Sequence, residues 1–350
     1  MQRRTLIRAL LASSAYALPS CSREDAKAEA LRSVIERVVV PNTAAVVEDS
    51  RRLEVELAQL AALPTLDTLG ASRQSWRRSI SSWKRLDAFR IGPVLESNSL
   101  LRAMFWPVRS AGIDALLQGE QAIDEASIDA MGVDRRGLFA LEYLLFAEDG
   151  EEQIVARFTG GAGERRARLA RALAGNISFY ATGLARSLAD GTAYARKFAE
   201  GGQESLNRLV AQLVYTVESV SANRLARTST LAKNGSLKAT AMEGGLARVS
   251  QLIALTSLRA AEELYLAAER GLCQLVKSQS AAVDRELRSA FARAIAAVSD
   301  LGAPLEDVAK RDPAQLDAAA ASVKSLERAL KVDLTSLLGV TASFASVDGD

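Results

Sequence analysis

The chain has 350 residues, of which 49% are apolar and 25% are charged, and it contains no histidine. This apolar content excludes a wholly disordered chain, and the missing histidine excludes Ser-His-Asp catalysis, His-ligated zinc and a histidine general base. The 44 basic and 42 acidic residues become 41 and 42 once the first twenty residues are removed, so the body has no basic field for nucleic acid and we expect no nucleic-acid partner.

The amino terminus has the order of an export signal. Residues 1–8 are basic, residues 9–18 form an apolar run too short to span a bilayer, and Leu18-Pro19-Ser20-Cys21 resembles a bacterial lipobox. We therefore expect residues 1–20 to be a signal peptide and Cys21 to become the lipid-modified first residue. A plain signal peptide cleaved nearby, and a buried helix with an incidental cysteine, remain open.

A lipid on Cys21 would hold the protein at a membrane without a spanning helix, and no later segment offers 18 uninterrupted apolar residues. The expected location is the bacterial periplasm, on a membrane through that lipid. Arg3-Arg4-Thr5-Leu6-Ile7 resembles a twin-arginine signal, and the Sec route remains equally open. Residues 21–30 are mostly polar and are predicted to form the tether.

From residue 31 onward the apolar residues recur with the helical period. We expect Pro41 to break the first helical stripe and to begin a helix that ends at Pro64. Another buried stripe is marked by spacings of four and three residues at Trp76, Ile80 and Trp83.

Pro107 is expected in the first turn of a helix that runs to about residue 117, and Asp134 is expected to cap a short helix that ends at Phe146. The loop of Gly160, Gly161 and Gly163 then precedes a long helix that reaches about residue 188. Later helical patterns cover residues 206–231, 246–275, 283–298 and 316–338.

No run shows sustained two-residue alternation, so the fold class is predicted to be all-α. Long helices joined by short breaks predict two antiparallel helix-bundle halves packed together. Glycines interrupt the pattern between residues 191 and 202, which places the halves at residues 31–195 and 196–350.

Residues 137–146 are apolar on every side, which predicts a buried helix, and Glu142 lies within it. An unpaired buried carboxylate is costly, so Glu142 needs a cation, a metal ion, donor groups or a proton. The candidate cations are Arg78, Arg85 and Arg109. Glu142 is either the centre of a binding site or part of a structural ion pair that fixes the helix register.

These residues carry a family resemblance. Gly137-x-Phe139-x-x-Glu142 resembles the Gly-x-His-x-x-Glu motif of the imelysin-like proteins, peptidase family M75. Phe89-Arg90-Ile91-Gly92-Pro93 and Phe105-Trp106-Pro107 precede it in the family's order, and the closing Asp348-Gly349-Asp350 resembles the family's ending. The match runs from about residue 31 to the carboxyl end.

The resemblance implies an exported and often lipid-anchored protein of two helical bundles, associated with iron acquisition and with a partner protein in iron uptake. It also implies a metal site, because the family's His and Glu are suggested as ligands. In this sequence Phe139 stands at the His position, and its hydrocarbon ring cannot coordinate iron. Glu142 is left as the one metal ligand of the motif, and further oxygen ligands such as Tyr143 would have to complete an iron site.

The candidate pocket combines the motif with aromatic and basic side chains that precede it, although aromatic residues at helical spacing are also typical of a core. Its residues are Gly137, Phe139, Glu142, Trp83, Arg85 and Trp106. No catalytic residue is predicted.

Two functions remain open from the sequence. The first is a non-catalytic exported lipoprotein that binds an iron-related ligand or partner. The second is a structural or interaction protein of the cell envelope without a metal site. A metallopeptidase ranks third, because His-Glu-x-x-His is absent.

Overall fold

The computed structural model describes residues 20–146, 150–189 and 191–341, and within these ranges every regular element is a helix. The all-α prediction is confirmed. None of the helices in these ranges is long and apolar enough to cross a bilayer. The expected signal peptide, the side chain of Cys21 and the Asp348-Gly349-Asp350 ending lie outside the described residues.

The elements follow one another as a first part that ends at Glu200 and a second part that begins at Gly202; η marks π- and 3-10 helices. The first part has α1 (Ser20–Val34), η1 (Ile35–Val39), α2 (Val40–Ala62), α3 (Leu66–Asp87), α4 (Pro93–Glu96), α5 (Ser99–Met104), α6 (Ser110–Gln118), α7 (Glu125–Ala130), η2 (Val133–Arg135), α8 (Gly137–Phe146), α9 (Glu151–Ala156), α10 (Gly160–Leu188) and α11 (Ala193–Glu200). The second part has α12 (Gly202–Glu218), η3 (Ser219–Ala226), α13 (Arg227–Lys233), η4 (Ala239–Ala241), α14 (Ser250–Leu266), α15 (Leu272–Gln279), α16 (Ala281–Ser299), α17 (Leu305–Arg311), α18 (Pro313–Ala329), η5 (Leu330–Leu334) and α19 (Thr335–Leu338).

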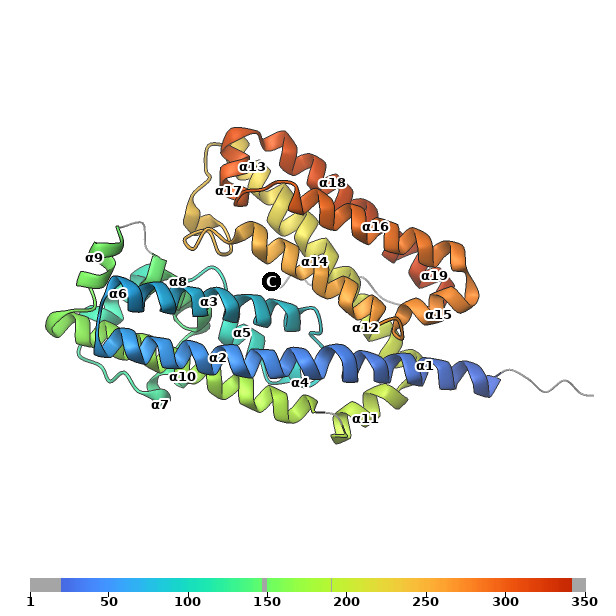
Figure 1. Ribbon diagram of the computed structural model, residues 1–350, viewed down its shortest axis with the longest axis horizontal. Helices are drawn as coiled ribbons and strands as arrows, with labels where there is room; N and C mark the ends of the chain where they lie inside the picture. Colours follow the sequence, from blue (N-terminus) through green and yellow to red (C-terminus); the bar gives the residue numbers. More distant parts are fainter. Residues whose placement is uncertain (1–19, 147–149, 190, 342–350) are drawn as a thin grey trace, which may run out of the picture.

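The elements α1, η1 and α2 form one uninterrupted rod (Figure 1). Residues 21–30, expected to form a tether, are therefore helical, and the predicted break at Pro41 is wrong. In an α-helix the proline ring would clash with the carbonyl of Arg37, four residues earlier. Arg37 lies in the π-helical segment η1, whose wider turn accommodates the ring and allows the helix to continue.

The pattern over residues 246–275 was expected to be one helix, but it contains two helices preceded by a loop. α14 begins only at Ser250, and it ends where Ala267, Ala268 and Glu269 take left-handed backbone angles, with φ of 38°, 53° and 68°. Two hydrogen bonds from Arg288 to the Glu269 carboxylate, of 2.8 and 2.7 Å, hold this turn. Because Arg288 and Glu269 are 19 residues apart, the local helical period does not indicate this turn.

The expected cap at Asp134 is also wrong in detail. Asp134 belongs to the 3-10 helix η2, and α8 begins three residues later at Gly137. Its carboxylate pairs instead with Arg109, at 3.0 Å.

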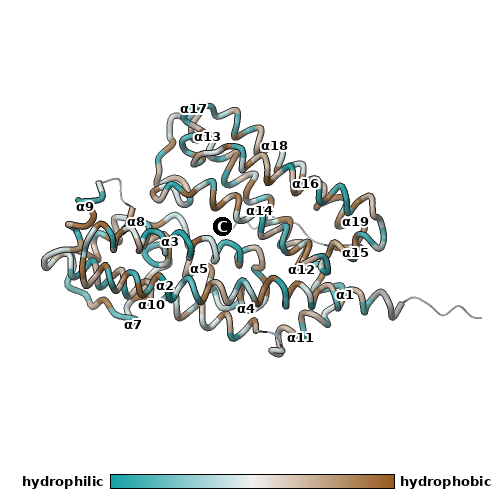
Figure 2. Tube along the Cα trace, in the orientation of Figure 1, coloured by the Kyte–Doolittle hydropathy of each residue, from teal (hydrophilic) through white to brown (hydrophobic). Residues whose placement is uncertain are grey.

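The long helices pack in two groups, which Figure 1 shows below and above its centre. α2 lies against α3 and α10 in the first group, and α16 lies against α14 and α18 in the second. α3 packs on α14 across the boundary, and the buried apolar side chains form one continuous core. Teal and brown alternate along most helices in Figure 2, as expected for helices with one buried face. The division near residue 195 stays a prediction, because this core does not stop there.

Candidate functional site

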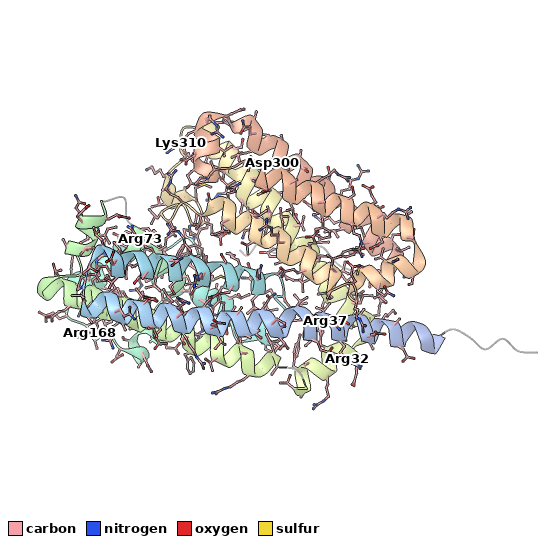
Figure 3. All side chains as sticks on the ribbon, viewed as in Figure 1. Arg32, Arg37, Arg73, Arg168, Asp300 and Lys310 are labelled. Carbon is pink, nitrogen blue, oxygen red and sulfur yellow. The ribbon has the colours of Figure 1, made fainter. Side chains whose placement is uncertain are left out.

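α8 is a buried helix, as its sequence predicts, with only Tyr143 partly exposed among residues 137–146. Two side chains of α3 hold its backbone carbonyls. Trp76 Nε1 donates to the carbonyl of Leu138 at 2.7 Å, and Arg73 Nε donates to the carbonyl of Leu145 at 2.8 Å (Arg73 is labelled in Figure 3). α8 is therefore held rigidly against α3 at both ends.

Gly137, the first residue of the motif, lies where α8 starts against the end of α5. Its φ is +78°, and a Cβ atom there would lie 2.5 Å from the carbonyl oxygen of Ala103. Only glycine tolerates both the left-handed backbone and this contact. The glycine of the motif therefore has a packing role.

Gly137→Ala is expected to lower the free energy of unfolding by about 2 kcal/mol or more, because a side chain in the left-handed region is strained and its Cβ overlaps backbone. Urea denaturation measures the loss. Gly70→Ala is the matched control, since Gly70 lies on an exposed face of α3 with no atom within 4 Å of the added Cβ. That control should gain roughly 0.5–1 kcal/mol from helix propensity. Equal effects at the two glycines would contradict the packing role.

Glu142 is only 3% exposed, and its Oε1 accepts a 2.8 Å hydrogen bond from the backbone N–H of Ala247. A donor group, one of the four expected kinds of partner, is therefore present, and two of the three candidate cations pair with other carboxylates. Arg85 pairs with Glu263 at 3.6 Å, and Arg109 with Asp134 at 3.0 Å.

The pKa of Glu142 is raised to about 8, mainly by burial; the negative charges of Glu243 and Glu306 also raise it, and the Ala247 hydrogen bond lowers it. The carboxyl is therefore mainly protonated at neutral pH. A protonated carboxyl is uncharged, so it can be buried without a neighbouring cation.

Ala247 belongs to residues 237–249, called here the 237–249 loop, which include η4 and form most of the connection between α13 and α14. Gly244 has φ of +73°, and a Cβ on Gly245 would lie 2.2 Å from the carbonyl oxygen of Ala239. These glycines let the loop fold back on itself and present Glu243. Glu142 thus anchors the inner side of the loop that carries Glu243.

A cleft of about 470 Å³ lies between the two groups of helices. One wall comes from α3, α5 and the segment that follows α5, and the other from α12, η3, α13 and the 237–249 loop. The charged side chains that line it are Lys84, Asp87, Arg90, Arg224, Arg227 and Glu243. The larger apolar ones are Leu100, Leu101, Met104, Phe105, Trp106, Met242 and Leu305.

Glu243 connects the two walls of the cleft. Its carboxylate pairs with Lys84 of α3 and accepts a 2.9 Å hydrogen bond from Arg224 Nε of η3. The side chains of Lys84 and Arg224 are only 5% and 12% exposed. Burial alone would raise the pKa of Glu243, but Arg224 and Lys84 outweigh it and lower the pKa to about 2.

The π-helical segment η3 places side chains along one wall. Tyr215, Ser219, Asn223 and Arg227 all line the cleft at intervals of four residues. In a straight α-helix this spacing would rotate successive side chains by about 40° per step around the axis. The wider turns of η3, which spans Ser219–Ala226, reduce that rotation, so that the row stays on the cleft.

The structure does not gather the six predicted site residues in one place. Trp106 lines the cleft, and Glu142 lies behind its wall. Trp83 is fully buried, with its Nε1 3.1 Å from Ser50 Oγ, and Phe139 is fully buried in the core. Arg85 is exposed beside Glu263. Their role in ligand binding stays a prediction.

The charged residues of the cleft are not among the site residues that the sequence predicts. Lys84 had a usable signal, because it follows Ile80 by four residues and therefore extends the buried stripe of α3. Arg224, Arg227 and Glu243 had none, since folding alone brings the loop and η3 to the cleft.

The motif residues do not fit a metal ion. The ring of Phe139 offers no donor atom, and Oε1 of the buried Glu142 already accepts the hydrogen bond from Ala247 N–H. Over residues 20–146, 150–189 and 191–341, no three acidic or cysteine side chains gather in a way that could hold a metal ion.

The fold and site define an all-helical protein with a charged cleft between two groups of helices. Residues 39–332 match the Imelysin family model, and the chain belongs to this family, peptidase M75. No curated protein sequence matches the chain.

Two solved structures share the fold. The "putative iron-regulated protein A precursor" from Parabacteroides distasonis ATCC 8503 is 17% identical, with a TM-score of 0.74 over 93% of this chain and 97% of that one. An imelysin-like protein from Psychrobacter arcticum 273-4 is 19% identical, with a TM-score of 0.76 over 92% of this chain and 98% of that one.

Proposed function

We propose that the protein is an exported imelysin-family lipoprotein that acts as a non-catalytic binding component linked to iron acquisition. The observation that carries this proposal is the cleft of about 470 Å³, which combines converging charged side chains with an apolar wall. The name of the Parabacteroides neighbour supports the iron link.

The polar groups of the cleft favour binding over catalysis. Glu243 is held by two cations, so its carboxylate is a poor general base. Ser219 Oγ accepts a 2.8 Å hydrogen bond from Arg224, and Ser250 Oγ accepts a 2.9 Å bond from Leu305 N–H and donates to Glu306. Ser219 Oγ in turn donates to the carbonyl of Thr216, which cannot act as a base, and Ser250 is only 2% exposed to a ligand in the cleft.

The lipid anchor is proposed from the sequence around Cys21, with the membrane as the partner of the lipid and the periplasm as the location. Cys21→Ser is expected to abolish incorporation of labelled palmitate and to release the protein from the membrane fraction. Unchanged membrane association in that variant would contradict the anchor.

Iron uptake by cells of the source bacterium, measured with and without the protein, tests the link to iron acquisition. Under iron limitation, cells lacking the protein are expected to take up less radioactive iron, and the wild-type gene should restore uptake. Unchanged uptake would contradict the link and favour the second candidate, a structural or interaction protein of the cell envelope. Casein cleavage by the purified chain with added zinc would contradict the non-catalytic role.

A further inference from the structure

We propose that the cleft binds an organic polyanion, a ligand with two or more carboxylate-type charges on an apolar or aromatic frame. The inference rests on the proposed function, in which the cleft is the ligand site. Three properties of the cleft carry it: its excess of positive charge, an arginine without a carboxylate partner, and the apolar part of its lining.

The cleft has four basic side chains and two acidic ones. Glu243 is shared by Lys84 and Arg224, and Asp87 is shared by Lys84, at 3.7 Å, and Arg90, at 3.5 Å. Two carboxylates cannot neutralise four cations, so an excess of two positive charges remains. In a cleft with apolar walls this excess attracts anions more strongly than it would on an open surface.

Arg227 supplies the free donor groups. Its side chain is exposed, and its guanidinium lies over the ring of Trp106, with 5.0 Å between its carbon and the ring centroid. Among the described residues it has no carboxylate partner. This cation–π contact holds the guanidinium at the wall of the cleft, while its N–H groups remain available to bind a carboxylate at two points.

The apolar side chains of the cleft favour a ligand whose frame is apolar or aromatic. Leu101 of α5 is 40% exposed, Phe105 and Trp106 are partly exposed, and all three border the same cleft as the cations. A small, fully hydrated anion would leave these side chains in water. An anion with an apolar or aromatic frame removes them from water while its charges meet the basic residues.

The same charges disfavour a bare metal cation. The positive excess repels Fe(III), and both carboxylates are already paired with cations. Iron would therefore reach the cleft only inside a chelate whose net charge is negative.

Calorimetry on the purified full chain tests the ligand class with benzene-1,3,5-tricarboxylate, its uncharged trimethyl ester and ferric citrate. The tricarboxylate is expected to bind at one site per chain, roughly tenfold more weakly in Arg227→Gln, and more weakly in 0.5 M salt than at low salt. The ester should not bind. Arg168→Gln is the matched control, because Arg168 is exposed on α10 and does not line the cleft (Figure 3).

Three results would overturn the proposal: equal binding of acid and ester, equal effects of Arg227→Gln and Arg168→Gln, or no binding of the tricarboxylate. Binding of ferric citrate alone would overturn the apolar frame and leave the iron link intact. Tricarboxylate binding together with normal iron uptake in cells lacking the protein would support the polyanion site and contradict the iron link. Because Arg227 is exposed, unchanged melting of Arg227→Gln will show that the variant is folded.

Discussion

Glu142→Ala is expected to lower the free energy of unfolding by about 3 kcal/mol at pH 7. The substitution leaves the buried N–H of Ala247 without an acceptor and opens a cavity between α8 and the 237–249 loop. Glu142→Gln should cost much less, since its amide oxygen can accept the same hydrogen bond and an amide resembles the protonated carboxyl in size. Urea denaturation of the two variants beside the wild type measures the difference. Equal losses would show that the Ala247 contact contributes nothing.

The pH dependence provides a second readout for Glu142. Its pKa is 4.5 in the unfolded chain and about 8 in the folded one. Between these values the folded state holds a proton that the unfolded state has lost, so stability falls as the pH rises from about 4.5 to about 8. Glu142→Gln removes this contribution. The stability of the variant relative to the wild type should therefore rise from pH 5 to pH 9, and a constant difference would mean that Glu142 is ionised in the folded protein.

Glu243→Gln is expected to have the larger effect, a loss of about 3–5 kcal/mol, because it leaves the buried cations Lys84 and Arg224 without their shared counter-charge. Glu204→Gln is the matched control. Glu204 pairs with Arg208 at 2.6 Å, but its side chain is 75% exposed, so its loss should stay below about 1 kcal/mol.

Glu243 should have the opposite pH dependence from Glu142. Its pKa falls from 4.5 to about 2 on folding, so its contribution is present above about pH 4.5 and is lost as the pH falls toward 2. Unfolding curves between pH 2 and pH 6 should converge for the wild type and Glu243→Gln at the acid end. Curves that stay parallel would show that Glu243 does not carry the charge that Lys84 and Arg224 need.

The helical period predicted much of this fold because it reports which residues face a core. Trp76, Ile80 and Trp83 are all fully buried, and Glu142 lies in the buried helix that its neighbours indicate. The partner of Glu142 was not predictable in the same way. Ala247 N–H is a backbone group 105 residues away, and no local pattern in the sequence indicates which donor group folding brings to Glu142.

The cleft was hidden for a related reason. Its charged residues come from α3, η3 and the 237–249 loop, and each has an ordinary local pattern in the sequence. The intervals of four residues from Tyr215 to Arg227 become meaningful only once the turn is known to be π-helical. The break predicted at Pro41 is wrong for the same reason, because the prediction assumes an α-helix before it where the structure has a π-helix.

The rod formed by α1, η1 and α2 extends from Ser20 to Ala62, a length of about 60 Å at 1.5 Å per residue. α1 packs on α11, α12 and α15, and the start of the rod projects beyond the other helices in Figure 1. A lipid at Cys21 would thus be joined to the body through a stiff connection. Because the rod is stiff, it would fix the distance between the lipid and the opening of the cleft, whatever the tilt of the anchored protein over the bilayer.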